Sequence, residues 1–208
     1  MQLNDAQTSD LLDRAVDGSA AAMHELMQVH RTRLRQMVAM RLDRRLRIRL
    51  DPSDVVQDVL LEAAGRLAEY TEQAKLPFYV WMRQIAWDRL LELYRQHVRV
   101  EKRSVTREIG HAMPLTDDSV DALVATLRSR DLSPSEQLIR KEVQRRARQA
   151  LAELGEVDRE LLLMRYVEQM KLREIAAQLS ISVTAAKSRH VRALTKISLI
   201  LQEEEGTL

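Results

Sequence analysis

Residues 180–197 read SISVTAAKSRHVRALTKI, and this stretch decides how the whole chain is interpreted. It contains five basic or potentially basic side chains and no acidic one. The acid-free interval is longer still, from Ile175 to Gln202, in a chain of which 31% of residues are charged. A helix that excludes every carboxylate over such a length calls for a physical explanation.

A helix that begins near Val183 would separate these side chains by their chemistry. Its apolar side would carry Val183, Ala186, His190, Ala193, Leu194 and Ile197. Its opposite side would carry Thr184, Ala185, Ser188, Arg189, Arg192, Thr195 and Lys196. Small residues followed by cations are typical of a helix that enters the DNA major groove, where the cations reach bases or phosphates. Phosphate would repel a carboxylate on that side, which accounts for the missing acids.

The residues before Val183 supply the rest of a DNA-binding motif. An i, i+3, i+4, i+7 spacing predicts a short helix with one buried face, formed by Leu172, Ile175, Ala176 and Leu179. Residues 180–182 then predict a tight turn, so that residues 172–197 form a helix-turn-helix. The alternative is a surface helix with a solvated basic face, which the adjacent helix and turn disfavour. We expect His190 at the boundary of the core and not as a metal ligand.

The composition indicates an all-α protein. Only 3% of the 208 residues are aromatic, Gly and Pro are few, and Leu, Ala, Arg and Glu are abundant. Because the chain has no Cys, it can form neither a disulfide nor a thiolate metal site. The polar N-terminus and the lack of a long apolar run predict a soluble cytoplasmic protein without signal peptide or membrane span. We expect no cofactor and no bound metal.

Three parts of the chain differ in composition. Residues 1–100 have helical periodicity and include DPSD at 51–54, with Asp51 as the N-cap of a helix and Pro52 in its first turn. Residues 101–133 are irregular and acidic, which is typical of a linker. Residues 134–202 form a second helical part, in which SPSE at 133–136 predicts a capping box and Asp158 caps the next helix. The fold class expected is therefore all-α, with two helical domains joined by an acidic linker.

The second part resembles region 4, the C-terminal promoter-binding module of sigma-70-family initiation factors. LREIAAQLSISVTAAKSRHVRAL, residues 172–194, contains the Lys-Ser-Arg…Arg-Ala pattern of that module. The family usually has Gly where this chain has Ser180, which must then adopt a left-handed backbone. The resemblance implies contacts to the −35 promoter element by Thr184, Ala185, Lys187, Ser188, Arg189 and Arg192. Taken alone, this part would equally fit a single-site regulator of the GerE-like kind.

The first part is similar to region 2 of the same family. SDVVQDVLLEA, residues 53–63, resembles the helix that docks on the clamp helices of the largest RNA polymerase subunit, and the matching positions are Asp54, Gln57 and Asp58. LPFYVWMRQIAWDRLLELYRQ, residues 76–96, resembles the segment that melts the promoter. The resemblance implies contacts to the −10 element by Tyr79, Trp87, Tyr94 and Arg95. We expect Phe78 and Trp81 in the core, and the family tends to have Arg-Asn where this chain has Trp87-Asp88.

Regions 2 and 4 joined by a short linker resemble the extracytoplasmic-function class of the family. The resemblance implies a promoter-specificity subunit whose partners are core RNA polymerase and promoter DNA, and it leaves open an anti-sigma factor. A stand-alone DNA-binding regulator and a purely structural helical adaptor are the other two interpretations. An enzyme is not expected, because the sequence contains no His-Glu-x-x-His spacing, Cys ligands or Gly-rich phosphate loop.

Overall fold

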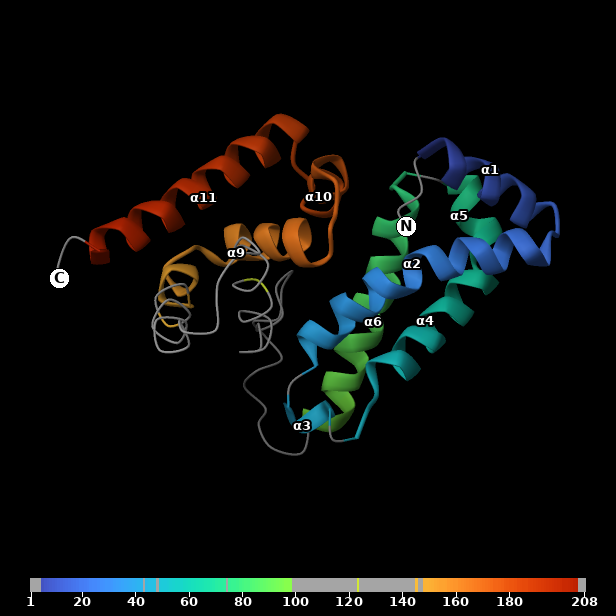
Figure 1. The fold of residues 1–208 in the computed structure, drawn as a ribbon. Coiled ribbons are helices and arrows are strands. Elements are labelled where there is room, and N and C mark those ends of the chain that lie inside the picture. Colours follow the sequence, from blue (N-terminus) through green and yellow to red (C-terminus); the bar gives the residue numbers. More distant parts are fainter. Residues whose placement is uncertain are drawn as a thin grey trace, which may run out of the picture. The chain divides into compact units, whose positions relative to one another are not determined.

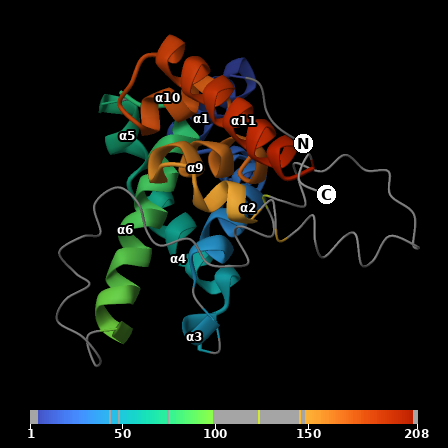
Figure 2. The ribbon, with the colours of Figure 1, turned by 90° about the vertical axis from the view of Figure 1, so that its left-hand side faces the viewer.

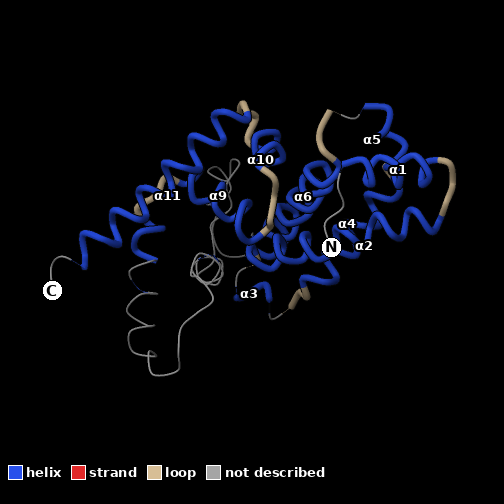
Figure 3. The backbone as a smooth tube through the Cα atoms, turned by 45° about the horizontal axis from the view of Figure 1, so that its top comes forward, coloured by secondary structure: helices blue, strands red, loops and turns tan. Residues whose placement is uncertain are grey.

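The computed structural model describes residues 5–42, 44–47, 49–73, 75–98, 123, 145 and 148–205. Every regular element within these ranges is a helix, and within each unit short loops join the described helices (Figure 3). The chain divides into two compact units, Met1–Glu108 and Ile109–Leu208. These observations confirm the all-α class with two helical domains. The predicted linker at 101–133 lies outside the described residues except for Leu123, which is helical and buried.

The first unit is built around three long helices (Figure 1). Its elements are α1 (Asp5–Val16), α2 (Ala20–Arg41), α3 (Arg44–Arg47), α4 (Pro52–Gly65), α5 (Leu67–Gln73) and α6 (Phe78–Val98). Helices α2, α4 and α6 pack against one another, α1 packs on α2, and α5 contacts both α1 and α4. Fully buried aliphatic side chains from all three long helices, such as Leu26, Val56 and Met82, fill the space between them.

Local chemistry sets the beginnings of α2 and α4. Gly18 ends the α1–α2 connection with a φ of +92°, a backbone angle that glycine adopts without steric cost. Ser19 then caps α2 by accepting a hydrogen bond from the N–H of Ala22 at 3.3 Å. Asp51 caps α4 by accepting one from the N–H of Ser53 at 2.6 Å, and this bond lowers the pKa of Asp51. The DPSD prediction for the start of α4 is therefore confirmed.

The second unit ends in a long helix that follows three short elements. Its described elements are α9 (Glu156–Leu162), the π-helical turn η3 (Leu163–Val167), α10 (Leu172–Gln178) and α11 (Val183–Glu205). The prediction that Asp158 caps α9 is wrong: Gly155 is the N-cap residue, and Asp158 lies inside the first turn. The predicted capping box at 133–136 lies outside the described residues.

The turn between α10 and α11 has the strained backbone that the sequence predicted. Ser180 has a φ of +53°, in the left-handed region that non-glycine residues rarely occupy. Two residues later, the Ser182 side chain accepts a hydrogen bond from the N–H of Ala185 at 3.1 Å and caps α11. At the other end of α10, the Glu174 carboxylate accepts one from the N–H of Lys171 at 2.7 Å. The predicted helix-turn-helix is thus present.

Candidate nucleic-acid and protein interfaces

Helix α11 lies across the rest of the helix-turn-helix with one face buried. It packs against α10 and α9, and Figures 1 and 2 both show it running over α9. The buried stripe consists of Ala186, Ala193 and Ile197, in agreement with the apolar side predicted from the sequence. Val183, in the first turn of α11, is 42% exposed, so the prediction that it belongs to the buried side is wrong.

The face opposite the buried stripe carries the side chains expected to contact DNA. Thr184, Lys187, Ser188 and Arg192 are exposed. Ala185 and Arg189 are half-buried, and the guanidinium of Arg189 pairs with the carboxylate of Asp158 on α9 at 2.9 Å. Four of the six predicted residues therefore lie on the open face, whereas Ala185 and Arg189 lie at its edge.

The exposed face contains a residue that the sequence analysis did not single out. Val191 is 60% exposed, three residues after Ser188 and seven after Thr184, near the middle of the open face. An exposed β-branched side chain on a groove-reading face can contact the methyl group of thymine. Helical spacing alone would have placed Val191 on the same side as Thr184 and Ser188. An apolar residue is usually assigned to the buried side, which explains why the sequence did not point to Val191.

His190 lies at the edge of the core, as expected. Its Nε2 is 3.0 Å from the hydroxyl of Tyr166 on η3, and the two rings are 5.6 Å apart. Partial burial, with a smaller contribution from Arg165, lowers the pKa of His190. The neutral imidazole therefore joins α11 to η3 as a hydrogen-bonding partner.

The residues expected to contact the −10 element differ widely in exposure. Tyr79 is only 1% exposed, and the guanidinium of Arg33 covers its ring at 3.6 Å from the centroid, so the ring has no free face for a base. Trp87 is half-buried, with Arg41 and Arg83 both within 6 Å of its ring centroid at 5.2 and 5.7 Å. The structure thus removes Tyr79 from the candidates for base stacking.

Tyr94 and Arg95 follow near the end of α6. Tyr94 is half-buried, and its hydroxyl donates a hydrogen bond to the backbone carbonyl of Arg41 at the end of α2. Arg95 is exposed. Phe78 is buried as predicted, whereas Trp81 is half-buried and stacks on Tyr70 with their centroids 4.7 Å apart.

One face of α4 is polar and open. Asp54, Gln57 and Asp58 are exposed, while Val56 and Val59 on the other side are buried in the bundle. The side chain of Leu61 is 66% exposed on the turn that follows Asp58. Leu61 thus places an exposed aliphatic side chain beside the carboxylates of this face.

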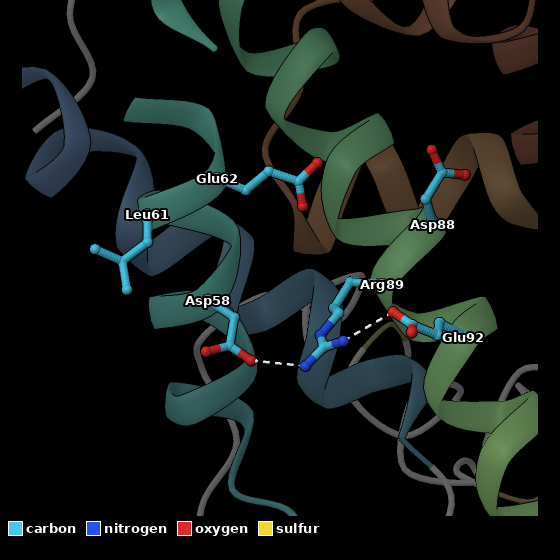
Figure 4. A pocket seen from close by; sticks show the side chains of 6 residues that line it. All are labelled: Asp58, Leu61, Glu62, Asp88, Arg89 and Glu92. Atoms are coloured by element: carbon cyan, nitrogen blue, oxygen red, sulfur yellow. Dashed lines mark hydrogen bonds and ion pairs between the residues drawn. The ribbon is translucent and has the colours of Figure 1, made fainter. Parts of the chain in front are cut away.

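The open face of α4 continues onto α6 through a shallow hollow of about 480 Å³. Its lining residues are Asp58, Leu61, Glu62, Asp88, Arg89 and Glu92. Figure 4 shows Arg89 between Asp58 and Glu92, with N–O distances of 2.9 and 2.8 Å, and Leu61 pointing away from α6. Four carboxylates surround one cation, so the hollow is suited to a basic partner.

Neither a metal site nor a membrane span is found among the described residues. None of the groups of His, Asp and Glu side chains in these ranges could hold a metal ion. None of the helices formed by these residues is both long and apolar enough to cross a membrane.

Comparison with known proteins gives matches to both parts of the chain. Residues 144–197 match the family model described as Sigma-70, region 4. The probable RNA polymerase sigma factor RfaY of Xanthomonas campestris pv. campestris is 29% identical over 140 residues, which cover 67% of this chain but only 31% of RfaY. RNA polymerase sigma factor CnrH of Cupriavidus metallidurans is 28% identical over 154 residues, covering 74% of this chain and 75% of CnrH.

The fold is also similar to a solved structure. The structure of CnrH in complex with the cytosolic domain of CnrY matches with a TM-score of 0.54 and 24% identity, covering 96% of this chain and 99% of that one. The fold and its open faces define a two-domain protein with a helix-turn-helix. The region 4 match and the two relatives show that the chain is similar to RNA polymerase sigma factors.

Proposed function

We propose that this chain is a promoter-specificity subunit of bacterial RNA polymerase, of the extracytoplasmic-function type, acting in the cytoplasm. The observation that carries the proposal is the open cationic face of α11, which belongs to a helix-turn-helix within the residues that match region 4. The polymerase would supply the chemistry of RNA synthesis. This chain would supply promoter recognition and strand separation.

In this proposal α11 enters the major groove of the −35 element. Thr184 and Ser188 lie on the exposed face, where their small side chains allow the backbone to approach base edges. Lys187 and Arg192 flank them and can reach bases or phosphates. The acid-free interval from Ile175 to Gln202 supports the proposal, because no carboxylate within it would repel the phosphate backbone.

The open face of α4 would bind the clamp helices of the largest polymerase subunit. Asp54 and Asp58 provide negative charge and Gln57 a hydrogen-bonding amide, and all three are exposed. Leu61 adds an apolar contact on the turn that follows Asp58. Charge complementarity of this kind steers association with a basic surface and fixes the orientation of docking.

The part of α6 from its middle to its end would contact the −10 element. Trp87, Tyr94 and Arg95 remain as candidates there, and stacking on an aromatic ring contributes about 1–3 kcal/mol per unpaired base. We include an anti-sigma factor among the proposed partners, because CnrH has been solved in complex with the cytosolic domain of CnrY.

The test is co-purification with core RNA polymerase, followed by transcription of genomic fragments with the reconstituted enzyme. We expect Asp54→Lys to weaken core binding at least about tenfold, since it reverses a charge that would face a basic surface. Asp13→Lys is the matched control, because Asp13 is equally exposed but lies on α1. Specific binding to promoter DNA by the free chain, without any affinity for core polymerase, would instead support a stand-alone regulator.

A further inference from the structure

Two cations of α11 are bonded to the segments that precede the helix-turn-helix. Arg189 Nη1 lies 2.9 Å from Oδ1 of Asp158, in the first turn of α9. Lys196 Nζ donates a hydrogen bond to the backbone carbonyl of Glu153 at 2.6 Å, where the helical residues 148–152 end. Both bonds lie on the same flank of α11, because seven residues bring the helix back to nearly the same side.

The other flank of α11 is fixed as well. His190 is within hydrogen-bonding distance of the Tyr166 hydroxyl on η3, 3.0 Å away. The stripe between the two flanks, Ala186 and Ala193, is buried. Polar bonds on both sides of a buried stripe prevent α11 from rolling about its axis, and such a roll would turn its open face away from the DNA.

Lys187 and Arg192 have different surroundings. Both side chains are exposed on the open face. The Nε of Arg192 is 3.4 Å from the carbonyl of Ser188 in its own helix, a weak contact that leaves the guanidinium facing solvent. In the part of the chain that the structure describes, neither cation is bonded to another element, so both can approach phosphate.

We propose that the cations of α11 divide into two groups with different roles. Arg189 and Lys196 are positioning residues that hold the recognition helix against α9 and residue 153, whereas Lys187 and Arg192 contact the DNA. The inference rests on the proposed function, in which α11 enters the DNA. A guanidinium that is already paired with a carboxylate adds little net charge, so Arg189 releases no counterion when DNA binds.

Salt dependence separates the two roles. The probe is a fluorescent duplex selected from a random pool by the full-length wild-type chain bound to core polymerase. Each phosphate contact contributes about 0.9 to the slope of log affinity against log salt concentration. We expect Lys187→Ala to lower the magnitude of the slope by about that amount. Arg189→Ala should keep the wild-type slope while weakening binding about two- to fivefold.

Asp158→Asn gives a second test, in which the sign of the effect is decisive. Removing a carboxylate near DNA should tighten binding if only long-range electrostatics matters. If Asp158 positions α11 through Arg189, binding should weaken instead, and the double variant with Arg189→Ala should be no weaker than Arg189→Ala alone. Arg189→Lys, which keeps a donor for Asp158, should recover most of the lost affinity.

A lower salt slope for Arg189→Ala, or tighter binding by Asp158→Asn, would overturn the division of roles while leaving the proposed function intact. If the wild-type chain retains no duplex from the pool in the presence of core polymerase, the proposed function itself fails, and the inference fails with it.

Discussion

His30 provides a quantitative test of how the first unit is packed. It lies on α2 with 6% of its surface exposed, and its ring packs against Phe78 and Tyr79 of α6 at centroid distances of 5.5 and 5.8 Å. Within the described residues, neither ring nitrogen has a hydrogen-bond partner. Burial, followed by the charge of Arg33, lowers the pKa of His30 from 6.5 to about 3.

The depressed pKa of His30 makes stability depend on pH. Below pH 6.5 the unfolded chain binds a proton at His30 that the folded chain does not bind until about pH 3. The free energy of unfolding should therefore fall as the pH drops through this window, by about 1.4 kcal/mol per pH unit. At pH 5 the expected loss relative to pH 7.5 is about 2 kcal/mol, a large part of the 5–15 kcal/mol typical of a domain.

The perturbation is His30→Leu, which replaces the ring by a side chain without polar atoms. A buried unsatisfied polar atom costs about 1–3 kcal/mol, so we expect the variant to gain at least about 1 kcal/mol at pH 7.5. It should also lose the part of the pH dependence that His30 causes. Urea unfolding at several pH values measures both effects, and tryptophan fluorescence reports on the first unit alone, because Trp81 and Trp87 are the only two tryptophans.

His24→Leu is the matched control for this experiment. His24 lies on the same helix but is exposed, so its replacement should leave the pH profile of the wild type unchanged. If the His30→Leu and wild-type profiles run parallel between pH 7.5 and 5, His30 is not buried as a neutral ring, and the packing of α2 against α6 described above is wrong.

Four further predictions concern the second unit. Ser180→Gly should raise the free energy of unfolding by about 0.5–1 kcal/mol in thermal melts, because glycine relieves the left-handed backbone, whereas Ser182→Ala should lower it by about 1 kcal/mol by removing the cap of α11. Val191→Ala should weaken binding to the selected duplex by up to about 1 kcal/mol and relax the preference at a single base position; an unchanged preference would show that Val191 does not face a base. Arg192→Ala should lower the salt slope by about 0.9, like Lys187→Ala, and a slope equal to that of the wild type would exclude a phosphate contact.

Local rules predicted the features that depend on neighbouring residues. The start of α4 followed from Asp51 and Pro52, because a cap and a first-turn proline act within one helical turn. The left-handed backbone of Ser180 followed from the resemblance, because the resembled family usually has Gly at this turn position. Leu61 could also have been found, since it lies off the apolar stripe that the spacing of α4 predicts.

The features that were missed depend on contacts between residues distant in sequence. Tyr79 looked like a candidate for base stacking, and only the packing of α6 on α2 reveals that Arg33 covers it. The ion pair of Arg189 could not be predicted either, because its partner Asp158 stands 31 residues earlier on another helix. Periodicity assigns a residue to a face of its own helix, and it cannot tell what the neighbouring helix brings to that face.

The exposed Leu61 affects how the isolated protein behaves. An exposed aliphatic side chain ordinarily promotes self-association. Around Leu61, however, four carboxylates line the same hollow: Asp58, Glu62, Asp88 and Glu92. Two copies meeting through this face would bring like charges together, and that repulsion opposes a homodimer. The charges around Leu61 therefore favour contact with a surface rich in lysine or arginine over contact with a second copy of this chain.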